Sequence, residues 1–191
     1  MKKIVIIIFI SFFITTCSNG KISHKKQSFL DFKNVVSKEV FTKFPITDSL
    51  VDLSISQKII YPEAMYASGY CGLFIEYEYK EKEYKKIYQN LKERSVFTSQ
   101  IYDSCNLNIP LLNNSKSVDC YNYSFPVPNI NDKFNDLDEL TEEKGTFLNF
   151  STKNGIFIND HKLLINNVNG YSNGAIVDYK ANHIIYWVII W

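Results

Sequence analysis

The chain has 191 residues, of which 46% are hydrophobic and 21% charged, and its formal net charge is +1. This length and composition suit a single globular domain and exclude intrinsic disorder. The nearly balanced charge gives no excess of positive charge for binding nucleic acid. Arg94 is the only arginine in the chain, and arginine is the side chain that binds phosphates through two parallel hydrogen bonds. We therefore expect no nucleic-acid partner.

The first seventeen residues have the layout of a signal peptide. Lys2 and Lys3 precede an apolar run from Ile4 to Ile14, which is interrupted only by Ser11. A positive start followed by a short apolar segment is typical of a secretory signal. The run is too short to span a bilayer as a helix, which needs about 20 apolar residues.

The end of this stretch, Ile14-Thr15-Thr16-Cys17, resembles the lipobox of bacterial lipoproteins, in which a Cys is acylated and the preceding peptide is removed. Ile14 stands where Leu is commonest in that family, and Thr16 where Gly, Ala or Ser is usual. The resemblance covers residues 1–17 only. It implies a signal peptide at residues 1–16 and a membrane anchor in which Cys17 carries a lipid such as palmitate.

The polar residues after Cys17 predict a flexible tether over residues 17–27, followed by one globular domain over residues 28–191. Surface-exposed lipoproteins of some bacteria resemble one another in an acidic run directly after the Cys. Ser18-Asn19-Gly20-Lys21 has no such run. The sequence therefore favours a cell-envelope location in which the anchored domain faces the periplasm.

The domain is expected to open with a helix. Ser28 with Asp31 three residues later forms a capping-box pattern, and Pro45 should end the helix. The apolar stripe of this helix would consist of Phe29, Phe32, Val36 and Val40.

The alternating residues Val51, Leu53 and Ile55 then predict a half-buried strand. A clearer strand follows from Gly69 to Lys80, with Cys71, Leu73, Ile75 and Tyr77 on one face and Phe74, Glu76 and Glu78 on the other.

A charged helix is expected directly after this strand. Glu81 and Lys85 stand at the i,i+4 spacing that stabilises helices, and an apolar stripe is formed by Tyr84, Ile87, Tyr88 and Leu91. Further elements are predicted as a strand from Val96 to Tyr102, an edge strand from Tyr121 to Val127 and an acidic helix from Asn131 to Lys144.

The four cysteines fit an oxidising compartment. Cys71 is in phase with the buried face of its strand and is expected to be a free, buried thiol. Cys105 and Cys120 flank a polar stretch, and we expect them to form a disulfide, which would contribute about 3 kcal/mol through loop closure.

After Gly145 the pattern predicts a β-meander. Its expected parts are a strand from Phe147 to Thr152, a hairpin turn at Asn154-Gly155, short strands at Ile156–Ile158 and Leu163–Ile165, a polar loop over Asn166–Asn173, and a hairpin of Ala175–Tyr179 with His183–Trp191. The last strand is apolar on both faces and so belongs near the middle of its sheet. The fold class is therefore α+β, a mostly antiparallel sheet with a C-terminal β-meander and two to three helices packed against it.

No arrangement typical of catalysis, a cofactor or a metal site is found. Glu76 and Glu78 share a strand face at a separation of about 7 Å, which is near that of glycosidase carboxylates. We expect both, however, to be solvated side chains on the exposed face of the strand. His24, His161 and His183 have no metal-site spacing, and the acidic residues between Asp132 and Glu143 do not follow the EF-hand pattern.

These observations favour a lipid-anchored, non-enzymatic envelope protein that binds another protein or a glycan, with some of the 13 tyrosines as a possible exposed binding surface. One alternative is a small envelope hydrolase with a dispersed active site, which would require a pocket that gathers Glu76, Glu78 or His183. A further alternative is a lipoprotein that neutralises a toxin.

Overall fold

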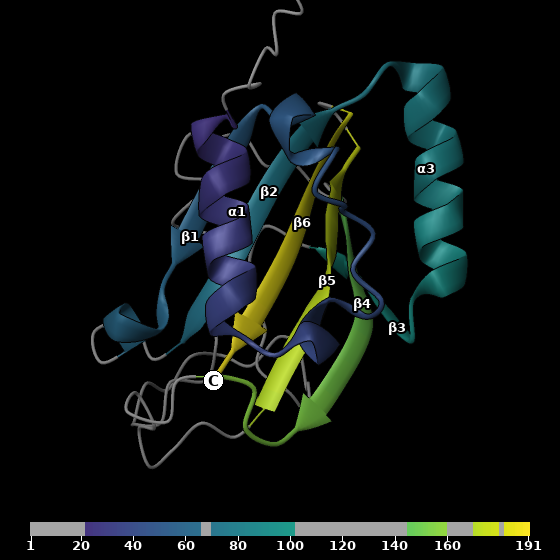
Figure 1. Cartoon of the computed structure of the whole chain (residues 1–191). Helices are drawn as coiled ribbons and strands as arrows, with labels where there is room; N and C mark the ends of the chain where they lie inside the picture. Colours follow the sequence, from purple (N-terminus) through teal and green to yellow (C-terminus); the bar gives the residue numbers. More distant parts are fainter. Residues whose placement is uncertain (1–21, 66–69, 102–144, 160–169, 180–181) are drawn as a thin grey trace, which may run out of the picture.

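The computed structural model describes residues 22–65, 70–101, 145–159, 170–179 and 182–191. Its described strands form one six-stranded sheet in the order β1-β2-β6-β5-β4-β3, and every neighbouring pair is antiparallel (Figure 1). The predicted α+β class is confirmed. The elements are α1 (His24–Val35), β1 (Ser56–Ile60), β2 (Cys71–Glu78), α3 (Glu81–Arg94), β3 (Phe97–Ile101), β4 (Gly145–Asn154), β5 (Gly170–Asp178) and β6 (His183–Ile190).

The C-terminal strands β4, β5 and β6 are consecutive neighbours, so the predicted meander is confirmed in outline. Strand β6 pairs with β2 on one side and with β5 on the other, and every residue from Ile184 to Ile190 is buried. The prediction that an apolar strand lies within the sheet is therefore correct. Burial on both faces leaves no solvated side for polar residues.

The first face of the sheet carries both described α-helices. Phe29 and Phe32 of α1, together with Tyr84 and Leu91 of α3, belong to the same buried cluster as the odd-numbered residues of β2 and the even-numbered residues of β6. Leu73, Ile75, Ile184, Tyr186 and Val188 are the sheet's main contributions to this cluster. The face assignments that were predicted for β2 and β6 are correct.

The second face carries a separate apolar cluster that is centred on Trp187. Its indole stacks on the ring of Phe147, with ring centroids 5.3 Å apart. Gly174 lies opposite Trp187 in the register, and a Cβ there would meet the indole at 2.6 Å and the Leu148 carbonyl oxygen at 2.0 Å. A glycine is therefore required at this close approach. The other members of the cluster are Tyr70, Phe74, Ile176, Ile185 and Ile189.

Helix α1 begins earlier than the capping-box pattern at Ser28 predicted. Ser23 is the N-cap, and its hydroxyl accepts a hydrogen bond of 3.1 Å from the Lys26 amide. The helix therefore starts inside the stretch that was expected to be tether. Any serine in extended backbone can cap a helix, so local sequence alone did not distinguish Ser23 from Ser28.

The same helix also ends earlier than predicted. Val36 is extended and forms a β-bridge with Ile158, while Val40 lies in a separate 3-10 helix, η1 (Lys38–Phe41). Both valines are fully buried. Val36 and Val40 are thus both buried, but they belong to two different elements, and their i,i+4 spacing does not mark one continuous helix.

The predicted strand through Val51, Leu53 and Ile55 is wrong. Val51–Leu53 is a 3-10 helix, η2, that buries Val51 and Ser54 and leaves Leu53 and Ile55 exposed. Burial at a spacing of three residues is what a 3-10 turn produces. Strand β1 begins directly afterwards, at Ser56.

The predicted hairpin at Asn154-Gly155 is also wrong. Strand β4 pairs with β5, and Asn154 stands opposite Gly170, so Ile156–Ile158 is not a returning strand. Phe157 and Ile158 are instead buried, and the Phe157 ring packs edge-on to Tyr171 at 4.6 Å. Residues 170–173, expected within a polar loop, begin β5, where Ser172 and Asn173 are fully buried.

The strand–helix unit after Gly69 was predicted correctly. Glu81 and Lys85 form an ion pair of 2.6 Å on α3, and β3 lies inside the stretch that was expected to be a strand.

Several predictions fall outside the described residues: the signal peptide with Cys17, the Cys105–Cys120 disulfide, the edge strand Tyr121–Val127, the acidic helix Asn131–Lys144, and the strand Leu163–Ile165. In the described parts of the chain, no helix is both long enough and apolar enough to cross a membrane.

Candidate functional site

Glu76 and His183, which lie far apart in the sequence, meet on the second face of the sheet. His183 Nδ1 lies 3.1 Å from Glu76 Oε1, and Ser56 Oγ donates a hydrogen bond of 2.6 Å to Glu76 Oε2. Three neighbouring strands, β1, β2 and β6, supply these side chains. We call Ser56, Glu76 and His183 the Glu76 cluster.

The strand register explains how the cluster forms. Ser56 stands directly opposite Glu76, and His183 stands opposite Glu78, so His183 is a diagonal neighbour of Glu76. Diagonal partners on one face are within reach of long side chains. Sequence reasoning did not identify Ser56, because its contact depends on a pairing between β1 and β2 that no local pattern reveals.

The cluster is only partly shielded from solvent. The Glu76 side chain is 20% exposed and that of His183 is 27% exposed. Glu76 and His183 form an ion pair only when the imidazole is protonated. The carboxylate thus joins β1 to β6 across β2, through the Ser56 hydroxyl on one side and His183 Nδ1 on the other.

A carboxylate that holds Nδ1 of a histidine orients the imidazole as a general base. The nucleophile in such a site must then contact the second nitrogen, Nε2. Here the Ser56 hydroxyl donates to the carboxylate, so Glu76, and not His183, is the central group. The cluster contains an oriented acid–base pair, but its serine is not placed as a nucleophile on the histidine.

The other candidate residues do not join this cluster. Glu78 is exposed at the end of β2, and His24 is exposed in the first turn of α1, while His161 lies outside the described residues. The described ranges contain no group of three or more His, Cys, Asp or Glu side chains that could hold a metal ion.

Cys71 is a free thiol that is fully buried in β2, as predicted. Burial raises the pKa of this thiol to about 12. The thiolate is the reactive form of cysteine. Cys71 therefore behaves as a small apolar side chain.

The tyrosines of the described residues are buried or half-buried and do not form an exposed binding surface. A group of them lies between α3 and the sheet. The Tyr88 hydroxyl is 3.1 Å from both Thr146 Oγ1 and the Tyr179 hydroxyl, and the Tyr84 hydroxyl donates to the Asp178 carbonyl at 2.8 Å. These contacts fasten α3 to β4 and β5.

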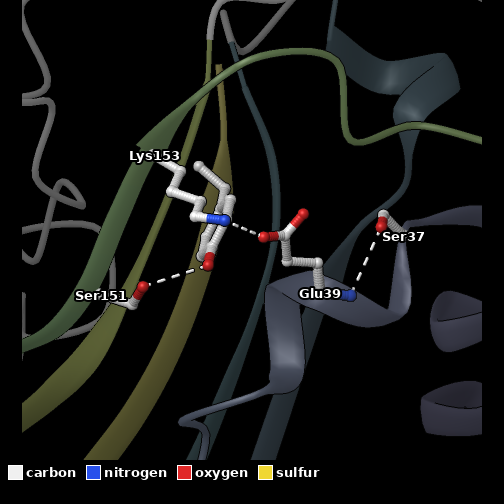
Figure 2. A network of polar contacts seen from close by, with 5 residues as sticks. Ser37, Glu39, Ser151 and Lys153 are labelled. Carbon is white, nitrogen blue, oxygen red and sulfur yellow. Dashed lines mark hydrogen bonds and ion pairs between the residues drawn. The ribbon is translucent and has the colours of Figure 1, made fainter.

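A second polar network ties η1 to the sheet. Glu39 forms an ion pair with Lys153 of β4, and the Glu39 amide donates to Ser37 Oγ at 3.3 Å (Figure 2). On the strand side, Ser151 Oγ lies 3.1 Å from the Tyr171 hydroxyl. The carboxylate of Glu39 raises the pKa of Lys153. Both charged side chains are about half exposed, so this network positions η1 without forming an enclosed site.

No protein-family model, no curated protein and no solved structure matches this chain.

Proposed function

We propose that this chain is a lipid-anchored protein of the bacterial cell envelope, facing the periplasm, whose domain binds a protein or a glycan. The observation that carries the proposal is the apolar segment that ends in Ile14-Thr15-Thr16-Cys17. Its support is the lysine pair, the short apolar run and the cysteine at the end, which together are the parts of a lipoprotein signal.

The position of the first described helix is consistent with this anchor. Helix α1 is capped at Ser23, so only a few residues separate the domain from Cys17. An acylated Cys17 would hold the domain close to a membrane. Binding is the favoured role because the Glu76 cluster lacks a serine on its histidine and because Cys71 is a buried thiol of raised pKa.

The anchor is tested by metabolic labelling with a palmitate analogue. Wild-type protein should take up the label and sediment with membranes, whereas Cys17→Ser should do neither. Cys71→Ala is the matched control, because it removes a different cysteine and should leave labelling intact. A Cys17→Ser variant that is still labelled would show that the anchor assignment is wrong.

The binding role is tested by chemical cross-linking in intact cells. The wild type should yield an adduct of defined mass with one protein or glycan, and Cys17→Ser, released from the membrane, should yield less of it. Failure to form any adduct would contradict the binding role.

A hydrolase is the second candidate, and the observation that favours it is the contact between His183 Nδ1 and Glu76 Oε1. In this case the purified protein should cleave ester or glycoside substrates, and both Glu76→Gln and His183→Asn should abolish the cleavage. Glu78→Gln is the matched control, because Glu78 is exposed at the end of the same strand. Cleavage that survives in all three variants would remove this cluster from consideration.

A further inference from the structure

An exposed group of aliphatic side chains lies beside the start of α1. Ile22, Leu50, Leu53 and Ile55 are 53%, 38%, 70% and 47% exposed. Single exposed apolar side chains are normal, whereas a contiguous group marks a contact surface. These four residues make up most of the large hydrophobic side chains that are exposed in the described parts of the chain. We call them the apolar patch.

Contacts between the two segments bring the patch together. Ser23, the neighbour of Ile22, donates a hydrogen bond to the Asp52 carboxylate, beside Leu53. Lys25 Nζ donates to the carbonyl of Ser54, which separates Leu53 from Ile55. The start of α1 is thus held against residues 50–55, although the two segments lie far apart in the sequence.

The sheet register places the patch at one end of the strands. The Ile55 amide donates to the Glu76 carbonyl at 2.8 Å, and the Tyr77 hydroxyl donates to the Leu50 carbonyl at 3.0 Å. Two patch residues, Leu50 and Ile55, are thereby tied to the C-terminal end of β2. Figure 1 shows the start of α1 at this same end of the sheet.

Chain length limits the distance between the patch and Cys17. Consecutive residues span at most about 3.6 Å, so the five steps from Cys17 to Ile22 cover no more than about 18 Å. An acylated Cys17 lies at the membrane interface. Ile22, a member of the patch, must then remain within that short distance of the lipid headgroups.

The chemistry of the patch fits a lipid surface better than water. Its four side chains are aliphatic, and such side chains enter the boundary between headgroups and acyl chains. Lys26 in the first turn of α1 is close by and suits anionic headgroups. Asp52 lies between Leu50 and Leu53 in the sequence, and its carboxylate accepts a hydrogen bond from the Ser23 hydroxyl.

We propose that the apolar patch rests on the membrane to which Cys17 is anchored and orients the domain with the start of α1 toward the bilayer. This inference rests on the lipid anchor proposed above. It leaves the opposite end of the sheet, where β4 ends at Asn154 and Ile156 follows, directed away from the membrane.

The test places a benzophenone side chain at position 53 or, as the matched control, at position 156 of the full-length protein. Leu53 and Ile156 are similarly exposed, at 70% and 62%, and lie at opposite ends of the strands. Cells are grown with radiolabelled phosphate and irradiated, and the purified protein is examined for phospholipid adducts. We expect the adduct yield at position 53 to exceed that at position 156 by about fivefold or more, because only the patch meets acyl chains.

Leu53→Glu combined with the benzophenone side chain at position 55 should reduce the lipid adducts, while its melting curve stays unchanged because Leu53 is exposed. Equal adduct yields at positions 53 and 156, or adducts with protein alone at position 53, would overturn the inference. The mass of the same purified protein reports whether Cys17 is acylated. An acylated protein without lipid adducts at position 53 refutes the patch only, whereas an unacylated protein refutes the anchor and with it the inference.

Discussion

Asn173 of β5 donates a hydrogen bond of 2.7 Å from Nδ2 to the carbonyl oxygen of Val40 in η1. Both residues are fully buried, and they are joined by packing between the first and last parts of the described chain. A buried carbonyl needs a donor, and Asn173 provides it from a strand that is otherwise apolar on this face. The contact, together with the Glu39–Lys153 ion pair, therefore sets the position of η1 on the sheet.

Asn173→Ala should lower the free energy of unfolding by about 1–3 kcal/mol, because it leaves the buried Val40 carbonyl without its donor. Denaturant unfolding followed by circular dichroism measures this loss. Lys153→Met is the matched control, because Lys153 also contacts η1. Its free energy of unfolding should change little, since the Glu39–Lys153 pair is exposed. Equal effects of the two substitutions would contradict the role of Asn173.

Asn173→Asp should be more harmful than Asn173→Ala at neutral pH, because a buried carboxylate would face the Val40 carbonyl. Burial raises the folded-state pKa of such a carboxyl above its unfolded value of about 3.9. The variant is therefore least stable, relative to the wild type, above the folded pKa, and it recovers as the pH falls toward 4. Parallel unfolding curves at pH 7 and pH 4.5 would reveal the recovery, and an unchanged difference would refute it.

Alkaline unfolding should begin above pH 10. Burial raises the pKa of Tyr77, Tyr84 and Tyr186 above the ordinary value of 10.0. Because the unfolded chain releases these protons near that value and the folded chain retains them, their contribution to stability is complete below pH 10 and is lost as the pH rises further. Tyrosinate absorbance and circular dichroism should change together. Ionisation of all tyrosines near pH 10 in a protein that stays folded would be inconsistent with their burial.

The final strand should be essential for folding. A chain that stops after Asn182 lacks β6, which joins β2 to β5, and should be unfolded or degraded.

Trp187→Ala should lower the free energy of unfolding by about 3–5 kcal/mol, since the indole is fully buried. Trp191→Ala should cost less, because Trp191 is only partly buried. Thermal melts measure both, with Ile156→Ala at an exposed position as the control. Unchanged melting of Trp187→Ala would contradict the burial of β6.

The cysteines should differ in reactivity. Non-reducing peptide mapping is expected to find Cys105 joined to Cys120, and Cys71 free. The Cys71 thiol should react with iodoacetamide only on unfolding, since it is fully buried and burial raises its pKa to about 12. A disulfide that includes Cys71, or rapid modification of Cys71 in the folded protein, would refute this assignment.

Local periodicity alone determined several parts of this protein. The alternation around Leu73 and Ile75 identified the face of β2 that packs against the helices, and the run from Ile184 to Ile190 identified a strand that is buried on both sides. The stripe that includes Tyr84 and Leu91 identified α3. These predictions succeeded because a side chain's face follows from the period of its own element. The anchor residue Cys17 is likewise read from neighbouring residues, and it stays a prediction.

The tertiary structure decided what depends on distant partners. Asn173 is polar and was assigned to a loop, yet it is buried because the Val40 carbonyl requires a donor at that point. Asn154-Gly155 suits a tight hairpin, but β4 pairs instead with β5, from Gly145 opposite Asp178 to Asn154 opposite Gly170. Glu76 meets His183 only because β2 and β6 are neighbours. Strand order and register are set by packing across the whole sheet, and no local pattern contains that information.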